Sequence, residues 1–506
     1  MSGPVRVGGQ RSLSVTVRGV LRRAVEAYRD QPQTAQWLRQ QLDRLDEPLR
    51  VAIAGKVKAG KSTLLNALVG EQIAPTDAGE CTRVVTWYCD GRSPKIVMHP
   101  KEGPPTPLTV NRQDGALAID LQGTSAEALN RLVVHWPSQS LRTATLIDTP
   151  GIASVSTDNS QRTLSFLTPE DDSPAEADAV IYLMRHLHAT DAKFLESFRD
   201  QGVGRATSVN TVAVLSRADE IGGGRIDAMF SAKTIAQRYR TDPTLRGLCQ
   251  GVVPVAGLLA QTGRTMRQVE FDALAALSRA PREEVDGLLL SSDRFLRADS
   301  AAITAIQPVE SAEIRHGLLN RFGLFGLRLS MTLIRQGTDT PAALAEELVR
   351  RSGLDELREL LNTQFTERRD LLKARSALLA LDSVLHGDTR SDIGPLLGDV
   401  ERILAGAHEF AELRLLSALR SGAVTLPKAE LAEAERLLGG SGAASEVRLG
   451  QPPGSGADEL RQVALEALTR WHRRAENPLS GRATADACRV VVRSCEGMVT
   501  RLASES

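Results

Sequence analysis

Gly55-Lys-Val-Lys-Ala-Gly-Lys61-Ser62 decides the fold, because it holds glycine, lysine and hydroxyl side chains in the GxxxxGK[ST] spacing. The apolar run that precedes it, Arg50–Ala54, predicts a strand, and the amphipathic stretch from Ser62 onward predicts a helix. A loop between such elements turns backbone N–H groups and the positive end of a helix toward phosphate oxygens. The sequence therefore predicts a phosphate-binding loop.

Each position of this loop has an expected role. Lys61 is expected to bridge the β- and γ-phosphates of a bound nucleotide, and the Ser62 hydroxyl to bind Mg²⁺. The remaining predicted nucleotide contacts come from the loop and the first turn of the helix: Gly55, Ala59, Gly60 and Thr63.

Two later segments predict the rest of the metal and γ-phosphate site. Asp148-Thr-Pro-Gly151 directly follows an apolar strand, so Asp148 can hold the magnesium shell and Gly151 can offer its N–H to the γ-phosphate. Thr82, which precedes the strand Val84–Tyr88, is expected to close over Mg²⁺ and position the attacking water; Thr76 is the competing candidate.

The base is expected to lie beside Ser216-Arg-Ala-Asp219, which ends another apolar strand. GTPases commonly carry [NT]KxD here, and Asp219 fits the residue that accepts hydrogen bonds from guanine. Ser216 replaces the usual Asn or Thr, and the Arg217 stem can cover the base. Ala256, after the strand Val252–Val255, is expected to touch the base through its backbone. GTP with Mg²⁺ is the predicted ligand.

Hydrolysis needs a source of transition-state stabilisation that the usual glutamine does not supply here. The position after Gly151 is Ile152, which cannot orient water. Lys58, in the middle of the loop, is the predicted catalytic cation, because an ammonium over the phosphates would neutralise developing charge. The alternative is a lysine that is merely solvated on an exposed loop.

Hydrophobic patterning divides the chain into three parts. Residues 1–48 are predicted to be helical, residues 49–262 to form a doubly wound α/β domain with a mostly parallel sheet, and residues 263–506 to be helical. Six apolar runs are the predicted main strands, suited to burial on both faces: Leu49–Ala54, Val84–Tyr88, Thr145–Ile147, Val180–Met184, Thr211–Leu215 and Val252–Val255. Shorter alternating pieces between Lys95 and Trp136 are predicted to be added edge strands.

Charge and hydropathy limit the partners. The 62 Lys and Arg residues equal the 62 Asp and Glu residues, so nothing indicates nucleic-acid binding. The N-terminal MSGPVRVGGQRSL has no apolar export core, and no apolar run reaches the roughly 18 residues of a membrane span. A cytoplasmic protein with at most peripheral membrane contact is expected.

These motifs and their surroundings resemble the bacterial dynamin-like GTPases, most closely the isoniazid-inducible dynamin-like proteins of mycobacteria. The resemblance rests on Gly55–Gly70, Ala74–Tyr88 and Leu215–Met229, and more softly on Arg321–Arg328 and Ser352–Arg358. It implies a GTPase head beside a helical neck built from segments before and after it, and a helical trunk whose tip touches lipid. In dynamins the residue matching Lys58 is a serine that helps hold a monovalent cation, whereas a guanylate-binding relative has an arginine finger there.

The resemblance also implies that heads dimerise, with each other or with a related dynamin-like partner. The expected activity is GTP hydrolysis that drives membrane remodelling or maintenance at the inner face of the plasma membrane, in a cell-envelope or drug response. Ser421–Pro427 is one candidate for lipid insertion, and an ordinary interhelical loop is its alternative reading. Two other functions remain open: a GTPase of RNA modification or ribosome assembly, and a nucleotide-gated scaffold with poor turnover.

Overall fold

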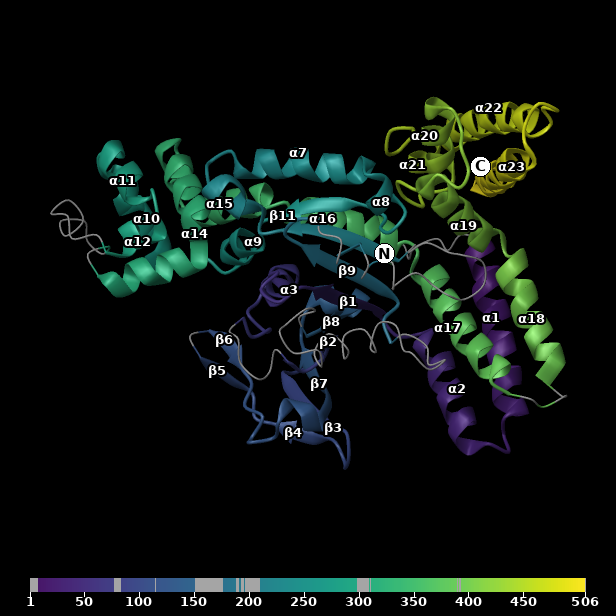
Figure 1. Ribbon diagram of the computed structural model, residues 1–506, viewed down its shortest axis with the longest axis horizontal. Helices are drawn as coiled ribbons and strands as arrows, with labels where there is room; N and C mark the ends of the chain where they lie inside the picture. The colour runs from purple at the N-terminus through teal and green to yellow at the C-terminus, as the bar shows by residue number, and fades with distance from the viewer. Residues whose placement is uncertain are drawn as a thin grey trace.

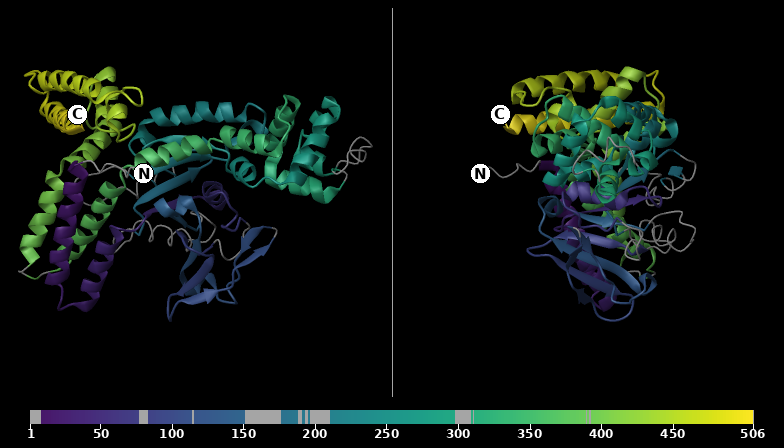
Figure 2. Two further views of the ribbon diagram at one scale, coloured as in Figure 1. Left: turned by 180° about the vertical axis from the view of Figure 1, so that it is seen from behind. Right: turned by 90° about the vertical axis from the view of Figure 1, so that its left-hand side faces the viewer.

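The computed structural model describes residues 8–76, 83–113, 115–150, 176–187, 191–192, 195, 210–297, 309, 311–388, 390 and 393–505. A central α/β head carries helices at both ends (Figure 1). One end holds the helices between residues 268 and 335. The opposite end holds two helical parts, a bundle that includes the N-terminal helices and a separate C-terminal helical unit (Figures 1 and 2). The predicted combination of an α/β domain with extensive flanking helix is confirmed.

The head is built on one mostly parallel sheet. Within the described residues it has nine strands in the order β11-β10-β9-β1-β8-β2-β7-β3-β4, and β5 and β6 form a separate hairpin. The strands are β1 (Leu49–Gly55), β2 (Thr86–Asp90), β3 (Lys95–Pro100), β4 (Thr106–Leu108), β5 (Asn111–Gln113), β6 (Ala116–Ala118), β7 (Leu129–Trp136), β8 (Ala144–Asp148), β9 (Ala179–Met184), β10 (Thr211–Ser216) and β11 (Val252–Val255).

Alternate residues of the central strands belong to different cores, which makes the sheet doubly wound. On β1, Val51 and Ile53 pack in the core that contains α3 (Lys61–Val69), whereas Ala52 and Ala54 pack in the core that contains α7 (Ala228–Thr241). β9 and β10 divide their side chains between the same two cores. Because both faces are covered, these strands consist of nearly continuous apolar residues, as the sequence predicted.

The strands β8, β1, β9, β10 and β11 are parallel to one another. The predicted strand at Val84–Tyr88 lies at 86–90 as β2 and runs antiparallel to β8, although it pairs parallel with β7. Its composition could not predict whether this strand is parallel or antiparallel to its neighbours, because a strand buried on both faces is apolar in either orientation. β7, expected among edge strands, lies inside the sheet between β2 and β3.

Helices after β11 complete the head. They are α9 (Gly257–Arg264), α10 (Gln268–Arg279), α11 (Arg282–Leu288), α12 (Ser292–Leu296), α14 (Ala312–Arg335), α15 (Pro341–Arg351) and α16 (Leu354–Leu361). Phe271, Phe322 and Leu348 share one core with β9 and β10, and Leu354 shares the other. Residues on both sides of position 262 therefore pack around the same sheet, and the domain boundaries at 48 and 262 stay predictions.

A helical bundle joins the two ends of the chain. It consists of α1 (Gly8–Ala27), α2 (Pro32–Arg44), α17 (Arg369–His386) and α18 (Gly394–Gly406), whose side chains form one core that includes Leu21, Leu38, Leu378 and Val400. Segments roughly 350 residues apart are thus side by side in Figure 1. Helices from before and after the head therefore share one core, and the role of this bundle as a neck stays a prediction.

The C-terminal unit has its own core. It comprises α19 (His408–Ser421), α20 (Lys428–Leu437), α21 (Ser445–Leu449), α22 (Ala457–Ala475) and α23 (Arg482–Glu505), with α22 and α23 as an antiparallel hairpin. The turn at 421–427 was one candidate for lipid insertion. Its Val424 and Leu426 are partly buried against this core, so the apolar side chains needed for insertion are already packed. This packing favours the alternative reading, an ordinary interhelical loop.

A short π-helical turn, η4 (Asn362–Thr366), connects α16 of the head to α17 of the bundle. Next to it, the buried Arg368 guanidinium donates to the carbonyl of Gly439, and the Gln364 amide donates to that of Gly440. The loop after α20 is therefore held at the point where head, bundle and C-terminal unit meet. No helix in the described part of the chain is sufficiently long and apolar to cross a membrane.

Candidate nucleotide-binding site

The predicted phosphate-binding loop has the expected position, between the end of β1 and the start of α3. Gly55 has φ +150°, and a Cβ there would lie 2.5 Å from the Leu183 carbonyl oxygen of β9. Gly60 is left-handed, with φ +91°, and caps α3. Both glycines are required by backbone geometry, since a side chain would collide at the first and be strained at the second.

The ammonium of Lys61 lies against the backbone of the loop. Its ammonium donates to the carbonyl oxygens of Gly55 and Lys56 at 3.3 and 3.4 Å, and burial lowers its pKa. These long contacts with neutral carbonyls are weaker than hydrogen bonds between charged groups. A phosphate would therefore be a better partner for Lys61 than the loop carbonyls are.

Ser62 and Asp148 meet at the position predicted for the metal. The Ser62 hydroxyl donates to Asp148 Oδ2 at 2.7 Å, whereas Asp148 Oδ1 is buried and has no hydrogen-bond partner in the described structure. Burial raises the pKa of the Asp148 carboxyl, with Lys61 and Ser62 acting in the opposite direction. A hard cation such as Mg²⁺ would bind the unpaired Asp148 Oδ1. One hydroxyl and one carboxylate are a suitable ligand set, because Mg²⁺ usually binds few protein ligands in addition to nucleotide phosphates.

The three lysines of the loop have different environments. Lys56 donates to Asp191 at 2.9 Å, and that 1 % exposed carboxylate also accepts a hydrogen bond from Tyr182 at 2.7 Å. Lys58 is exposed and left-handed, with φ +61°. A non-glycine residue in that conformation costs about 1 kcal/mol or more and is often found at functional sites. Lys58 is thus the loop lysine whose side chain faces solvent.

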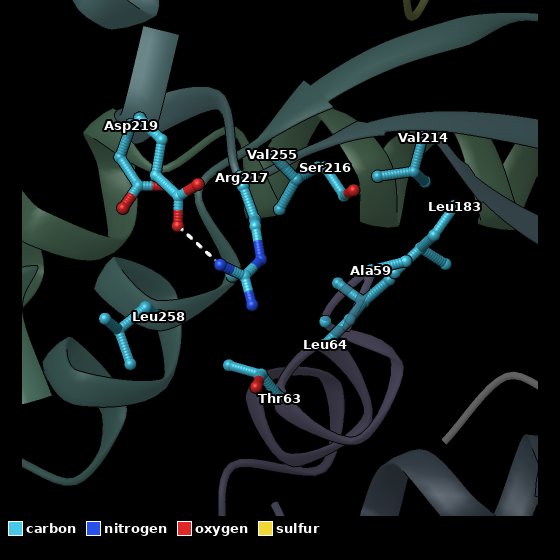
Figure 3. Close-up of a pocket in the computed structure, with 13 residues that line it drawn as sticks. Ala59, Thr63, Leu64, Leu183, Val214, Ser216, Arg217, Asp219, Val255 and Leu258 are labelled. Atoms are coloured by element: carbon cyan, nitrogen blue, oxygen red, sulfur yellow. Dashed lines mark hydrogen bonds and ion pairs between the residues drawn. The ribbon is translucent and has the colours of Figure 1, made fainter. Parts of the chain in front are cut away.

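A pocket connects the loop helix to the predicted base site (Figure 3). Ala59 and Thr63 line it from one side, and Ser216, Arg217 and Asp219 line it from another. Ser216, 6 % exposed, donates its hydroxyl to the Met184 carbonyl and so ties the end of β10 to β9. Residues from distant segments of the chain therefore line one pocket.

Asp219 is the buried acid of this pocket. It is 7 % exposed, and burial raises the pKa of its carboxyl to about 6. Gly323, where α14 is kinked with φ +62°, lies close enough that a Cβ would be 3.9 Å from Asp219 Oδ2. α14 therefore forms part of the wall behind the predicted guanine-binding acid.

The backbone groups of Ala256 are hydrogen-bonded within the fold. It is fully buried, its N–H donates to the Ser352 carbonyl, and its own carbonyl accepts from Ala260. Its neighbours Val255 and Gly257 line the pocket instead. The backbone of Ala256 thus links the end of β11 to the helices that follow. Its predicted contact with the base stays a prediction.

Thr82 and Gly151 lie outside the described residues, so their predicted contacts stay predictions. The competing Thr76 is described and is exposed at the end of the loop after α3.

Several site residues were missed from the sequence. Asn66 is 1 % exposed and accepts hydrogen bonds from the N–H groups of Ile73 and Ala74, which fixes the chain leaving α3. Thr149 donates its hydroxyl to a β1 carbonyl and attaches the Asp148 turn to that strand. Asp191 has no local sequence signal, because its partners come from other elements. The polar Asn66 inside an apolar helix was a signal that could have been used.

Comparisons with known proteins agree with this geometry. The model of the dynamin family matches residues 51–213. The chain is 44 % identical to isoniazid-induced protein IniC of Mycobacterium tuberculosis over 499 residues, covering 97 % of this chain and 99 % of that protein. It is 22 % identical to the bacterial dynamin-like protein of Nostoc punctiforme over 367 residues, which is 67 % of this chain and 50 % of that one.

Among solved structures, one from an oligomerised bacterial dynamin pair described as sensing and tethering membranes covers 99 % of this chain and 75 % of its own, with 14 % identity and a TM-score of 0.31. The match to IniC extends over nearly the full length of both chains and confirms the resemblance to the isoniazid-inducible group. With the phosphate loop, the Ser62–Asp148 pair and the Asp219 pocket in the expected order, the chain belongs to the dynamin family of GTPases, as a relative of isoniazid-induced protein IniC.

Proposed function

We propose that this protein binds Mg²⁺–GTP and hydrolyses it to remodel or maintain the membrane at the cytoplasmic face of the plasma membrane. One observation carries the nucleotide part: a single pocket extends from the start of α3 to Asp219, and Ser62 with the orphan oxygen of Asp148 lies at the phosphate end. Membership of the dynamin family supports the hydrolytic and membrane parts.

In this proposal the phosphates bind the loop N–H groups and Lys61, while Ser62, Asp148 and Thr82 hold the metal. Bound Mg²⁺ would neutralise phosphate charge. Gly151 would donate its N–H to the γ-phosphate.

Lys58 is the proposed catalytic cation. Lys56 already forms an ion pair with Asp191, and Lys61 is buried beneath the loop. Lys58 is exposed and can therefore bend over a bound triphosphate. Its ammonium would stabilise charge that develops during γ-phosphate cleavage. A bound monovalent cation is the alternative source of this positive charge.

The proposed membrane contact is the turn between α22 and α23. Pro478 and Leu479 are exposed there, Leu479 by 93 %, and the turn points away from the head (Figure 1). The side-chain carbonyl of Asn477 accepts a hydrogen bond from the Leu479 N–H and holds the turn tight. The exposed Arg473 and Arg482 flank it, which suits an anionic lipid surface.

The remaining parts of the proposal follow from the family. Heads would associate as homodimers, or with a related dynamin-like partner, during the nucleotide cycle. Expression would respond to isoniazid or to comparable damage of the cell envelope, as the description of the relative indicates for that protein.

The deciding experiment measures GTP turnover and vesicle co-sedimentation of the whole protein, with and without anionic liposomes. Lys61→Ala should abolish turnover. Leu479→Glu should reduce lipid binding and leave lipid-free turnover intact, whereas Leu465→Glu, a partly exposed position in the middle of α22, serves as its control. Turnover without lipid association would remove the membrane role, and tight GTP binding without turnover would favour a nucleotide-gated scaffold.

A further inference from the structure

Glu220 bridges two arginines at the edge of the base pocket. Its Oε1 accepts a hydrogen bond from Arg217 at 2.7 Å, and its Oε2 accepts one from Arg185 at 2.6 Å. Arg217 and Glu220 both line the pocket, while Arg185 follows the end of β9 and does not line it. Both carboxylate oxygens are therefore committed, one to a pocket residue and one to a support outside the pocket.

Arg217 needs such an anchor. Its backbone is left-handed, with φ +51°, so the side chain starts from a fixed and uncommon direction. Figure 3 shows it extending across the pocket toward Thr63, and its guanidinium donates to the carboxylate of Glu220. A free arginine side chain has substantial rotamer entropy to lose before it can stack on a planar base.

We propose that Glu220, supported by Arg185, is a positioning residue that holds the Arg217 guanidinium against the face of the bound guanine. The inference rests on the proposed nucleotide function and adds a residue to it. Glu220 acts through Arg217 and makes no contact with the base in this proposal. A guanidinium stacked on an aromatic ring binds through its face, which requires that its plane be fixed.

A surface ion pair without a positioning role would not change nucleotide affinity when it is removed. The side chain of Glu220 is 44 % exposed, and exposed pairs contribute little to stability. Removing Glu220 should therefore leave the thermal unfolding temperature unchanged. Only a positioning role predicts a loss of nucleotide affinity that disappears when Arg217 is absent.

The test is a double-mutant cycle on the full-length protein, with the dissociation constant of a fluorescent GDP analogue as readout. Glu220→Ala should weaken binding by about three- to tenfold, the range expected for one cation–π contact. Glu220→Ala should have no further effect in an Arg217→Ala background, and Arg185→Ala should have a smaller effect of the same kind. Asp227→Ala is the matched control, since it removes a nearby exposed carboxylate that pairs with Arg225.

Three results would overturn the proposal: unchanged affinity of Glu220→Ala, additive losses in the double variant, or an equal loss in Asp227→Ala. A wild-type protein that does not bind the GDP analogue would instead refute the proposed nucleotide function. The two failures are therefore distinguishable in one data set.

Discussion

Nucleotide affinity should depend on pH through Asp219. Burial raises the pKa of this carboxyl to about 6, and only the ionised form can accept hydrogen bonds from both guanine N1 and its exocyclic amine. The binding-competent form therefore predominates at neutral pH and is lost as the pH falls through about 6. One pH unit below the pKa, the dissociation constant should be about tenfold higher, which corresponds to about 1.4 kcal/mol.

The same shift has the opposite consequence for the free protein. Because the native pKa of Asp219 exceeds the ordinary value of 3.8, ionisation costs more in the folded state. Its contribution to the free energy of unfolding is fully present below the ordinary pKa and is lost as the pH rises through about 6. Nucleotide affinity and intrinsic stability should therefore respond to pH in opposite directions.

Equilibrium titration with a fluorescent GDP analogue, repeated from about pH 8 down to about pH 5, would measure this effect. The Asp219→Asn variant is the reference, because it has no titrating group here but keeps the other pH-dependent groups, including the nucleotide phosphates. The wild type should lose about tenfold more affinity than this variant across the range. Parallel pH profiles of the two proteins would refute the reasoning.

Three further predictions concern Lys58, the contact of Gly353 with β11, and the Lys56–Asp191 pair. Lys58→Met should lower kcat by about a hundredfold with little change in GTP affinity, measured by steady-state turnover and titration; an equal loss of affinity would contradict a catalytic role. Gly353→Ala should lower the free energy of unfolding in urea by about 2–4 kcal/mol, because φ is +81° and the new Cβ would collide with the Pro254 carbonyl oxygen of β11. The control is Gly454→Ala, which has a similar φ of +85° but open space around the new Cβ, and it should lower the free energy of unfolding by about 1 kcal/mol. Equal losses in the two glycine variants would exclude the collision as the cause. Asp191→Asn should destabilise the fold by at least about 1 kcal/mol, and adding Lys56→Met should recover part of that loss in the same assay; fully additive losses would exclude their coupling.

Local patterns were sufficient for the main elements of the head. The runs that became β1, β8, β9, β10 and β11 were predicted within about one or two residues, because strands covered on both faces are marked by uninterrupted apolar residues. The direction of β2 and the interior place of β7 were missed, since strand order is a property of the whole sheet.

The phosphate loop is the clearest feature that the sequence determined alone. Gly55, Gly60, Lys61 and Ser62 lie within one short segment, and their chemistry needs only the local strand–loop–helix geometry. The positions of Asp148–Gly151 and Ser216–Asp219 were also predictable, because each segment follows an apolar strand and parallel strands bring their carboxyl ends to one edge.

Only the tertiary structure decided which residues support that edge. Asp191 is paired with Lys56 across 135 residues. Gly323 of α14 lies close to the carboxylate of Asp219, although α14 comes far later in the chain. Glu220 accepts a hydrogen bond from Arg185, which follows β9, and its sequence context did not indicate this partner. These contacts depend on which elements pack together, and packing partners distant in the chain leave no periodic or spacing signal in one sequence.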